Sequence, residues 1–195
     1  MKSRYVVSLE VRRDASSSPI DAALLDLEIA GYLARKGMTQ DAKAIIKRVR
    51  SQELPCASSK VVATLNLVEG LLCHIAGLDA DALLKWRRAT AIASADECID
   101  VLAIVAGWTA FLHYTNGRFE SMIDELRNAF ELHRRNPAVG ALTSRSRMVV
   151  ALVLHTCRKT QEALHWYKDA RGAALSVGDD VEIEAAEDVR HTPMS

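Results

Sequence analysis

The chain repeats a short turn-like segment at intervals of about forty residues. The four copies begin at Gly37, Gly77, Gly117 and Arg158, so successive copies lie 40, 40 and 41 residues apart. Apolar residues recur every three or four positions on both sides of each copy, which is the period of an amphipathic helix. Repetition at a fixed period indicates a solenoid, in which each helical hairpin buries its apolar face against the next. A solenoid offers extended surfaces to partners rather than a catalytic cleft.

Each repeat is predicted to form two helices joined by a tight turn. Gly37, Gly77 and Gly117 can adopt the left-handed conformation that closes a helix at little cost. That conformation is less favourable for Arg158, which carries a Cβ atom, so we expect a different geometry in the fourth turn. Pro55, Pro137 and Gly178 lie in the connections between repeats, as expected of helix breakers. The predicted helices lie near residues 19–36, 39–52, 59–76, 79–94, 97–115, 119–134, 142–157, 160–176 and 180–190.

The segment before the first repeat has a different pattern. Tyr5, Val7, Leu9 and Val11 fall at every second position, which is the period of a strand. A single strand is not stable alone, so the segment either pairs with another copy or domain or forms a frayed tail. The expected organisation is an N-terminal tail or strand, one helical repeat domain and a short C-terminal tail, at residues 1–17, 18–190 and 191–195.

Composition argues against several classes of protein. The 25 Lys and Arg residues equal the 25 Asp and Glu residues, so no overall field attracts nucleic acid or an anionic membrane. The most apolar stretch, residues 98–114, contains Asp100 and is shorter than the roughly 20 residues that a membrane span needs. The four cysteines show no paired spacing and no secretory leader is visible. We therefore expect a cytoplasmic protein without direct nucleic-acid or membrane contact.

Small and large residues recur at fixed positions within units that begin at Ala23, Ala63, Ala103 and Ser144. Position eight holds Ala30, Gly70, Ala110 and Ala151; position twenty holds Ala42, Ala82, Met122 and Ala163; position twenty-four holds Ile46, Trp86, Leu126 and Tyr167; position twenty-seven holds Val49, Ala89, Ala129 and Ala170. Small residues at such points let two helices approach closely. Over about residues 19–176 the pattern resembles the tetratricopeptide repeat family.

The resemblance implies an all-α fold, a right-handed superhelix of four helical hairpins plus a terminal helix. The sequence departs from the family in two respects, because its unit exceeds the usual 34 residues and position four lacks the usual aromatic. Position four instead holds Asp26, Asn66, Ala106 and Arg147. Extended repeats of this kind look like those of bacterial signalling proteins.

Family geometry also implies which residues line the concave face of such a superhelix. These form an apolar groove with a polar edge, made by Leu67, Leu71, His74, Phe111, Tyr114, Met148, Leu152 and His155. The groove could accept an amphipathic helix or an apolar ligand, with the histidines supplying hydrogen bonds. Alternatively, tight curvature, a terminal helix or the N-terminal strand fills the groove and these residues are core. Only Arg35 and Arg145 are basic there, so a clamp for carboxylate ends is not expected.

Patterns typical of catalysis or metal binding are missing from the sequence. Cys73, His74, His113, His155 and Cys157 fall near helix ends, but none forms the short ligand pair typical of zinc sites. No nucleophile elbow, HExxH helix or phosphate-binding loop is present. We expect no metal, no cofactor and no enzymatic activity. Two basic runs are interpreted as solvated edges, namely Arg134, Arg135, Arg145 and Arg147, and Lys85, Arg87 and Arg88.

The resulting hypothesis is a protein-binding scaffold or regulatory module that takes a peptide or partner protein in the apolar groove. The alternative is a ligand-responsive sensor or input domain of a bacterial signalling or transcription-regulatory protein. Residues 179–190 form either a polar cap or the start of a fifth unit. An unfinished end would expose apolar surface that a second copy could cover, which makes a homodimer one alternative.

Overall fold

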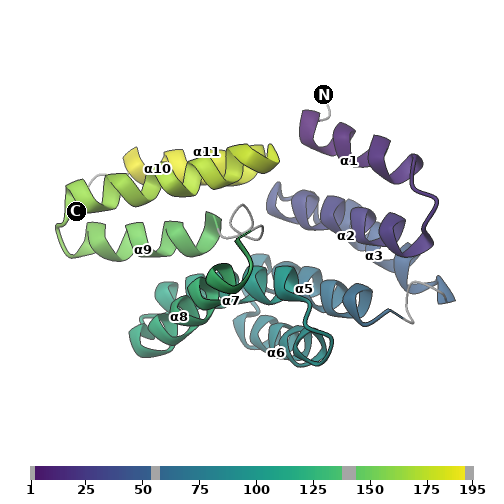
Figure 1. The fold of residues 1–195 in the computed structure, drawn as a ribbon, viewed down its shortest axis with the longest axis horizontal. Helices are drawn as coiled ribbons and strands as arrows, with labels where there is room; N and C mark the ends of the chain where they lie inside the picture. Colours follow the sequence, from purple (N-terminus) through teal and green to yellow (C-terminus); the bar gives the residue numbers. More distant parts are fainter. Residues whose placement is uncertain (1–2, 54–57, 138–143, 192–195) are drawn as a thin grey trace. The chain divides into compact units, whose positions relative to one another are not determined.

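The structure is a computed structural model that describes residues 3–53, 58–137 and 144–191 (Figure 1). These residues are mostly helical and contain no strand, so the predicted all-α fold class is confirmed for them. The helices are α1 (Arg4–Asp14), α2 (Pro19–Arg35), α3 (Thr39–Arg50), α5 (Ser59–Ile75), α6 (Asp79–Ala95), α7 (Ile99–Thr115), α8 (Phe119–Arg135), α9 (Ser144–Thr156), α10 (Thr160–Val177) and α11 (Asp180–His191). Each helix predicted from residue 19 onward is found within two residues of its expected ends, except that the expected start at residue 142 lies outside the described residues. Pro55, Cys56 and the tail at 192–195 lie outside the described residues.

The N-terminal segment forms a helix, so the prediction of a strand or frayed tail over residues 1–17 was wrong. The Ser3 side chain caps α1 by accepting a hydrogen bond from the amide of Tyr5. Val6 and Leu9, three residues apart, are buried where α1 packs against α2, whereas Val7 and Val11 are exposed. The alternating pattern predicted the wrong structure. Of its apolar residues Val7, Leu9 and Val11, only Leu9 is buried in the core.

The chain divides into two compact units, unit 1 (Met1–Val101) and unit 2 (Leu102–Ser195). In unit 1, α2 packs against α1, α3 and α5, and α5 packs against α6. The core of α2, α3 and α5 consists of Ala23, Leu27, Ala30, Ala34, Ala42, Ile46, Val49, Val61, Leu65 and Val68. In unit 2, α10 packs against α9 and α11. Ala110, Met122 and Val149 join α7, α8 and α9 in a smaller cluster.

All four repeated turns have the same geometry. Gly37, Gly77, Gly117 and Arg158 have φ values of 78°, 75°, 68° and 60°. In each turn the next residue donates its amide to a carbonyl five positions back, over 2.8–2.9 Å, as from Met38 to Leu33 and from Lys159 to Leu154. This pair of features is the Schellman motif that ends many helices. The expected difference at Arg158 was therefore wrong, because its backbone accepts the left-handed conformation despite the Cβ atom.

The recurring small positions are packed as predicted. Every residue at positions eight, twenty and twenty-seven of the units is buried. At Gly70 the indole of Trp86 lies directly against the glycine. Trp86 is 1% exposed and donates its ring N–H to the carbonyl of Leu67 over 3.1 Å. Gly70 thus creates the space that lets α6 place a tryptophan against α5.

A basic pocket lined by three helices

The basic pocket begins with a stripe of positive charge on α3. Lys43, Lys47 and Arg50 are four and seven positions apart, which places them on one side of a helix. All three are exposed, while Ala42, Ile46 and Val49 on the same helix are buried in the core. Like charges at these spacings destabilise an isolated helix slightly, so the stripe gives α3 no local stabilisation.

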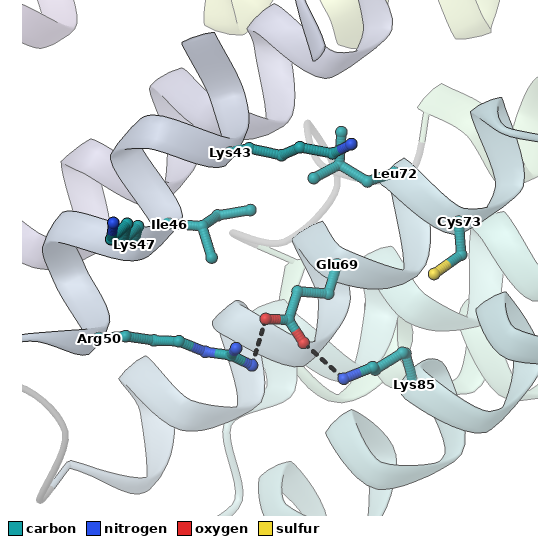
Figure 2. Close-up of a pocket in the computed structure, with 8 residues that line it drawn as sticks. All are labelled: Lys43, Ile46, Lys47, Arg50, Glu69, Leu72, Cys73 and Lys85. Atoms are coloured by element: carbon teal, nitrogen blue, oxygen red, sulfur yellow. Dashed lines mark hydrogen bonds and ion pairs between the residues drawn. The ribbon is translucent and has the colours of Figure 1, made fainter. Parts of the chain in front are cut away.

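The stripe faces a pocket of about 400 Å³ within unit 1 (Figure 2). We call it the basic pocket; its lining residues are Lys43, Ile46, Lys47 and Arg50 of α3, Glu69, Leu72 and Cys73 of α5, and Lys85 of α6. Ile46 is 6% exposed and Leu72 is half-buried against the same core, so both give the pocket an apolar wall. Charged groups beside such a wall interact more strongly than in bulk water.

Glu69 is the only acidic residue in this lining and it is held by two cations. Lys85 Nζ lies 2.7 Å from Glu69 Oε2, and Arg50 pairs with Glu69 Oε1, as the dashed lines in Figure 2 show. The Glu69 side chain is only 12% exposed, and a carboxylate so buried requires such partners. Lys43 and Lys47 form no ion pair with any described residue. The lining therefore contains four cations and one carboxylate, which is an excess of positive charge that the Asp81 carboxylate near Cys73 offsets only in part.

Cys73 contributes a neutral thiol to the basic pocket. Burial raises its pKa above the ordinary value, and the nearby Asp81 carboxylate raises it further, against the opposing effect of Lys85. A thiol that stays protonated at neutral pH is a poor nucleophile. The pocket thus combines fixed positive charge with an apolar wall and lacks an activated nucleophile, an arrangement suited to binding an anion.

The residues predicted to line an apolar groove lie elsewhere, and none lines the basic pocket. In unit 1, Leu67 and Leu71 are buried, and half-buried His74 places Nδ1 3.0 Å from Asp79 Oδ1. Leu67 and Leu71 therefore present little side-chain surface to a partner, as expected if they are core residues.

The remaining predicted groove residues belong to unit 2. Met148 is buried in the core cluster of α9 and α10, with Phe111 and Leu152 packed against it. The hydroxyl of Tyr114 lies 3.0 Å from that of Thr156, and the ring of His155 packs against Tyr167. Met148 therefore also has a core role, while Phe111, Tyr114, Leu152 and His155 stay half-buried.

Lys85 and Arg145 were predicted to lie in solvated edges, but Lys85 is half-buried and Arg145 is buried. Lys85 is half-buried in the pocket lining, in contrast to its exposed neighbours Arg87 and Arg88. Arg145 is 9% exposed, lies 2.7 Å from Glu182 and stacks 4.1 Å from the ring of Trp108. Both residues pair with carboxylates on other helices, Lys85 with Glu69 and Arg145 with Glu182, which local spacing does not reveal.

The described residues contain no group of three or more His, Cys, Asp or Glu side chains arranged to hold a metal ion. No helix among them has both the length and the apolar character needed to cross a membrane. The sequence matched no family model, and no similar curated protein or solved structure was found.

Proposed function

We propose that this chain is a non-enzymatic binding module of the tetratricopeptide-like type, which recognises an acidic region of a partner protein through the basic pocket. The observation that carries this proposal is the excess of cations around Glu69, because Lys43 and Lys47 have no ion-pair partner in the described part of the chain. Uncompensated cations beside an apolar wall attract an anionic group that can also bury apolar surface.

The four repeated hairpin turns support a scaffold role. Each turn closes with the same hydrogen bonds, and the repeated crossing positions are buried, so within each unit the packed hairpins hold surface residues in place. The proposed contact differs from the apolar groove expected from the sequence. Three of the eight groove residues are buried, whereas Lys43, Lys47 and Arg50 are exposed at the pocket.

A sensor for a small anionic molecule is the second candidate. The pocket volume of about 400 Å³ falls within the range typical of small-molecule sites, and Ile46 and Leu72 supply apolar contacts. A ligand that binds only the native state would raise the thermal stability of the protein by mass action. Native mass spectrometry of the purified protein would reveal a small-molecule adduct directly.

The partner-binding proposal can be tested with a fluorescein-labelled, glutamate-rich peptide and its glutamine counterpart. Fluorescence anisotropy at low salt should show that the protein binds the acidic peptide and that Lys43→Gln/Lys47→Gln weakens binding by about tenfold or more, since charge-assisted hydrogen bonds are lost. The matched control, Arg87→Gln/Arg88→Gln, removes the same charge from exposed positions on α6 and should retain binding. Equal binding of both peptides, or equal losses in both variants, would contradict the proposal.

A further inference from the structure

We infer that the anion for which the basic pocket is built is a phosphate monoester dianion, carried by a phosphorylated side chain of the partner protein. This inference rests on the proposed function and narrows it from acidic groups in general to one chemical class. It depends on four features of the pocket: its charge excess, the number and type of its donors, the position of Glu69, and its apolar wall.

The charge excess exceeds what one carboxylate ligand can neutralise. Lys43, Lys47, Arg50 and Lys85 supply four positive charges, and Glu69 supplies one negative charge. Within the lining three positive charges remain, offset in part by the Asp81 carboxylate near Cys73, and a single glutamate or aspartate of a partner would still leave the pocket positive. A phosphorylated side chain carries about −1.5 to −2 charges at neutral pH, which matches the excess more closely.

The donors of the basic pocket also suit a phosphate group. A lysine ammonium donates three hydrogen bonds as a compact charge, and an arginine guanidinium donates from a planar fork. Lys43 and Lys47 bring donors with no ion-pair partner within the described residues, and Arg50 adds a guanidinium one turn further along α3. Three cationic groups on one side of a helix correspond to the three acceptor oxygens of a phosphate monoester.

Glu69 fixes two of the cations in advance. Its two oxygens hold Arg50 and Lys85 from opposite sides, so those side chains are already ordered before a ligand arrives (Figure 2). Ordering long side chains in advance lowers the entropic cost of binding. Figure 2 shows Lys43 extending from α3 toward Leu72 and Lys47 projecting from α3 beside Ile46. Neither ammonium pairs with Glu69, so both can donate to an anion at the mouth of the pocket.

The apolar wall strengthens the preference for a doubly charged ligand. Ile46 and Leu72 exclude water from one side of the cations, which raises the strength of each charge interaction. In a field that is positive overall, the attraction grows with the charge of the ligand. A dianion therefore gains about twice the electrostatic attraction of a monoanion at the same place.

The test compares three labelled peptides of identical sequence that carry serine, glutamate or phosphoserine at one position, with inorganic phosphate as a competitor. We expect the phosphoserine peptide to bind the wild-type protein about tenfold more tightly than the glutamate peptide, because an added charge-assisted hydrogen bond has roughly that effect. Lys43→Gln/Lys47→Gln should abolish this difference, while Arg87→Gln/Arg88→Gln should preserve it. Alkylation of Cys73, followed by mass spectrometry, should slow when the phosphoserine peptide is bound.

A pH titration separates phosphate recognition from general attraction of acids. The second pKa of a phosphate monoester is about 6, so lowering the pH from about 7.5 to about 5.5 converts the dianion to a monoanion. Affinity for the phosphoserine peptide should therefore fall over this range as the pH is lowered. Affinity for the glutamate peptide should stay level, because a carboxylate remains ionised there and no histidine lines the pocket.

The outcomes distinguish the inference from the proposed function. Equal affinity for the glutamate and phosphoserine peptides would overturn the phosphate inference and leave the proposed function standing. Failure of both acidic peptides to bind more tightly than the serine peptide would overturn both. Tight binding of inorganic phosphate, with no preference among peptides, would also overturn the partner-borne phosphate and favour a small-molecule sensor.

Discussion

Substituting Gly70 by alanine should destabilise unit 1 strongly, because the space of its missing side chain is filled by Trp86. A Cβ atom at Gly70 would lie 2.3 Å from Nε1 and 2.4 Å from Cδ1 of the indole. Trp86 is 1% exposed, so the ring cannot move without disturbing other core atoms. Overpacking of this kind costs about 1–3 kcal/mol. Moving the indole also breaks its hydrogen bond to the Leu67 carbonyl, which costs about 1–3 kcal/mol when the groups stay buried.

The expected net effect of Gly70→Ala is a loss of about 3 kcal/mol, after about 1 kcal/mol is returned by the better helix propensity of alanine. For a chain of this length the midpoint of thermal unfolding should fall by about 6–12 °C, measured by far-UV circular dichroism. Gly172→Ala is the matched control, because Gly172 lies inside α10 with no atom within 4 Å of its added Cβ. That variant should be as stable as the wild type or up to about 1 kcal/mol more stable. Equal stability of Gly70→Ala and the wild type would refute the close-approach argument.

Three further predictions concern unit 2 and use urea unfolding as the measurement. Arg158→Gly should stabilise the protein by about 0.5–1 kcal/mol, because glycine adopts the φ of 60° without Cβ strain, and a loss of stability would contradict this. Glu182→Gln should lower the free energy of unfolding by about 3 kcal/mol, because it leaves the charge of buried Arg145 uncompensated. The double variant Arg145→Met/Glu182→Leu should be close to neutral, since it removes both charges. Equal losses in the two variants would argue against a buried ion pair. Burial raises the pKa of Tyr167 to about 12. The neutral Tyr167 phenol therefore makes its full contribution to the free energy of unfolding below the unfolded pKa of about 10. That contribution falls by about 1.4 kcal/mol per pH unit as the pH rises from there through the folded pKa. Tyr167→Phe should reduce that alkaline loss, and an unchanged slope would contradict the assignment.

The sequence predicted the helices well because their boundaries depend on local chemistry. Apolar residues at a helical period and left-handed glycines at Gly37, Gly77 and Gly117 are visible without knowledge of tertiary contacts. The N-terminal helix was missed because seven alternating residues are too few to separate a period of two from one of 3.6. The cap at Ser3 was the available signal for a helix, since its side chain accepts from the Tyr5 amide.

The basic pocket was harder to predict because it depends on which helix faces meet. Lys43, Lys47 and Arg50 are spaced as a one-sided stripe, which periodicity alone could have revealed. Glu69 and Lys85, however, are sixteen residues apart and lie on different helices. Only the packing of α5 against α6 brings their charges together, and no local pattern encodes that pairing.

Asp26, at position four of the first repeated unit, is a buried acid with a clear structural role. This residue is 5% exposed, and its Oδ1 lies 3.1 Å from Arg13 of α1 and 2.9 Å from Arg48 of α3. A buried carboxylate on α2 therefore links this helix to α1 and to α3. Either arginine alone can keep that carboxylate paired, so Arg13→Ala or Arg48→Ala should each cost about 1 kcal/mol, within the range of exposed ion pairs.

Removing both arginines should have a disproportionate effect, because it leaves the Asp26 carboxylate buried without either cation. The double variant is expected to lose about 3–5 kcal/mol, more than the two single losses together. Adding Asp26→Leu to the double variant should restore much of the loss, since an apolar side chain needs no partner at that site. Urea unfolding of the single, double and triple variants measures these terms. Additive losses, without recovery in the triple variant, would mean that the arginines act by packing rather than by compensating the charge of Asp26.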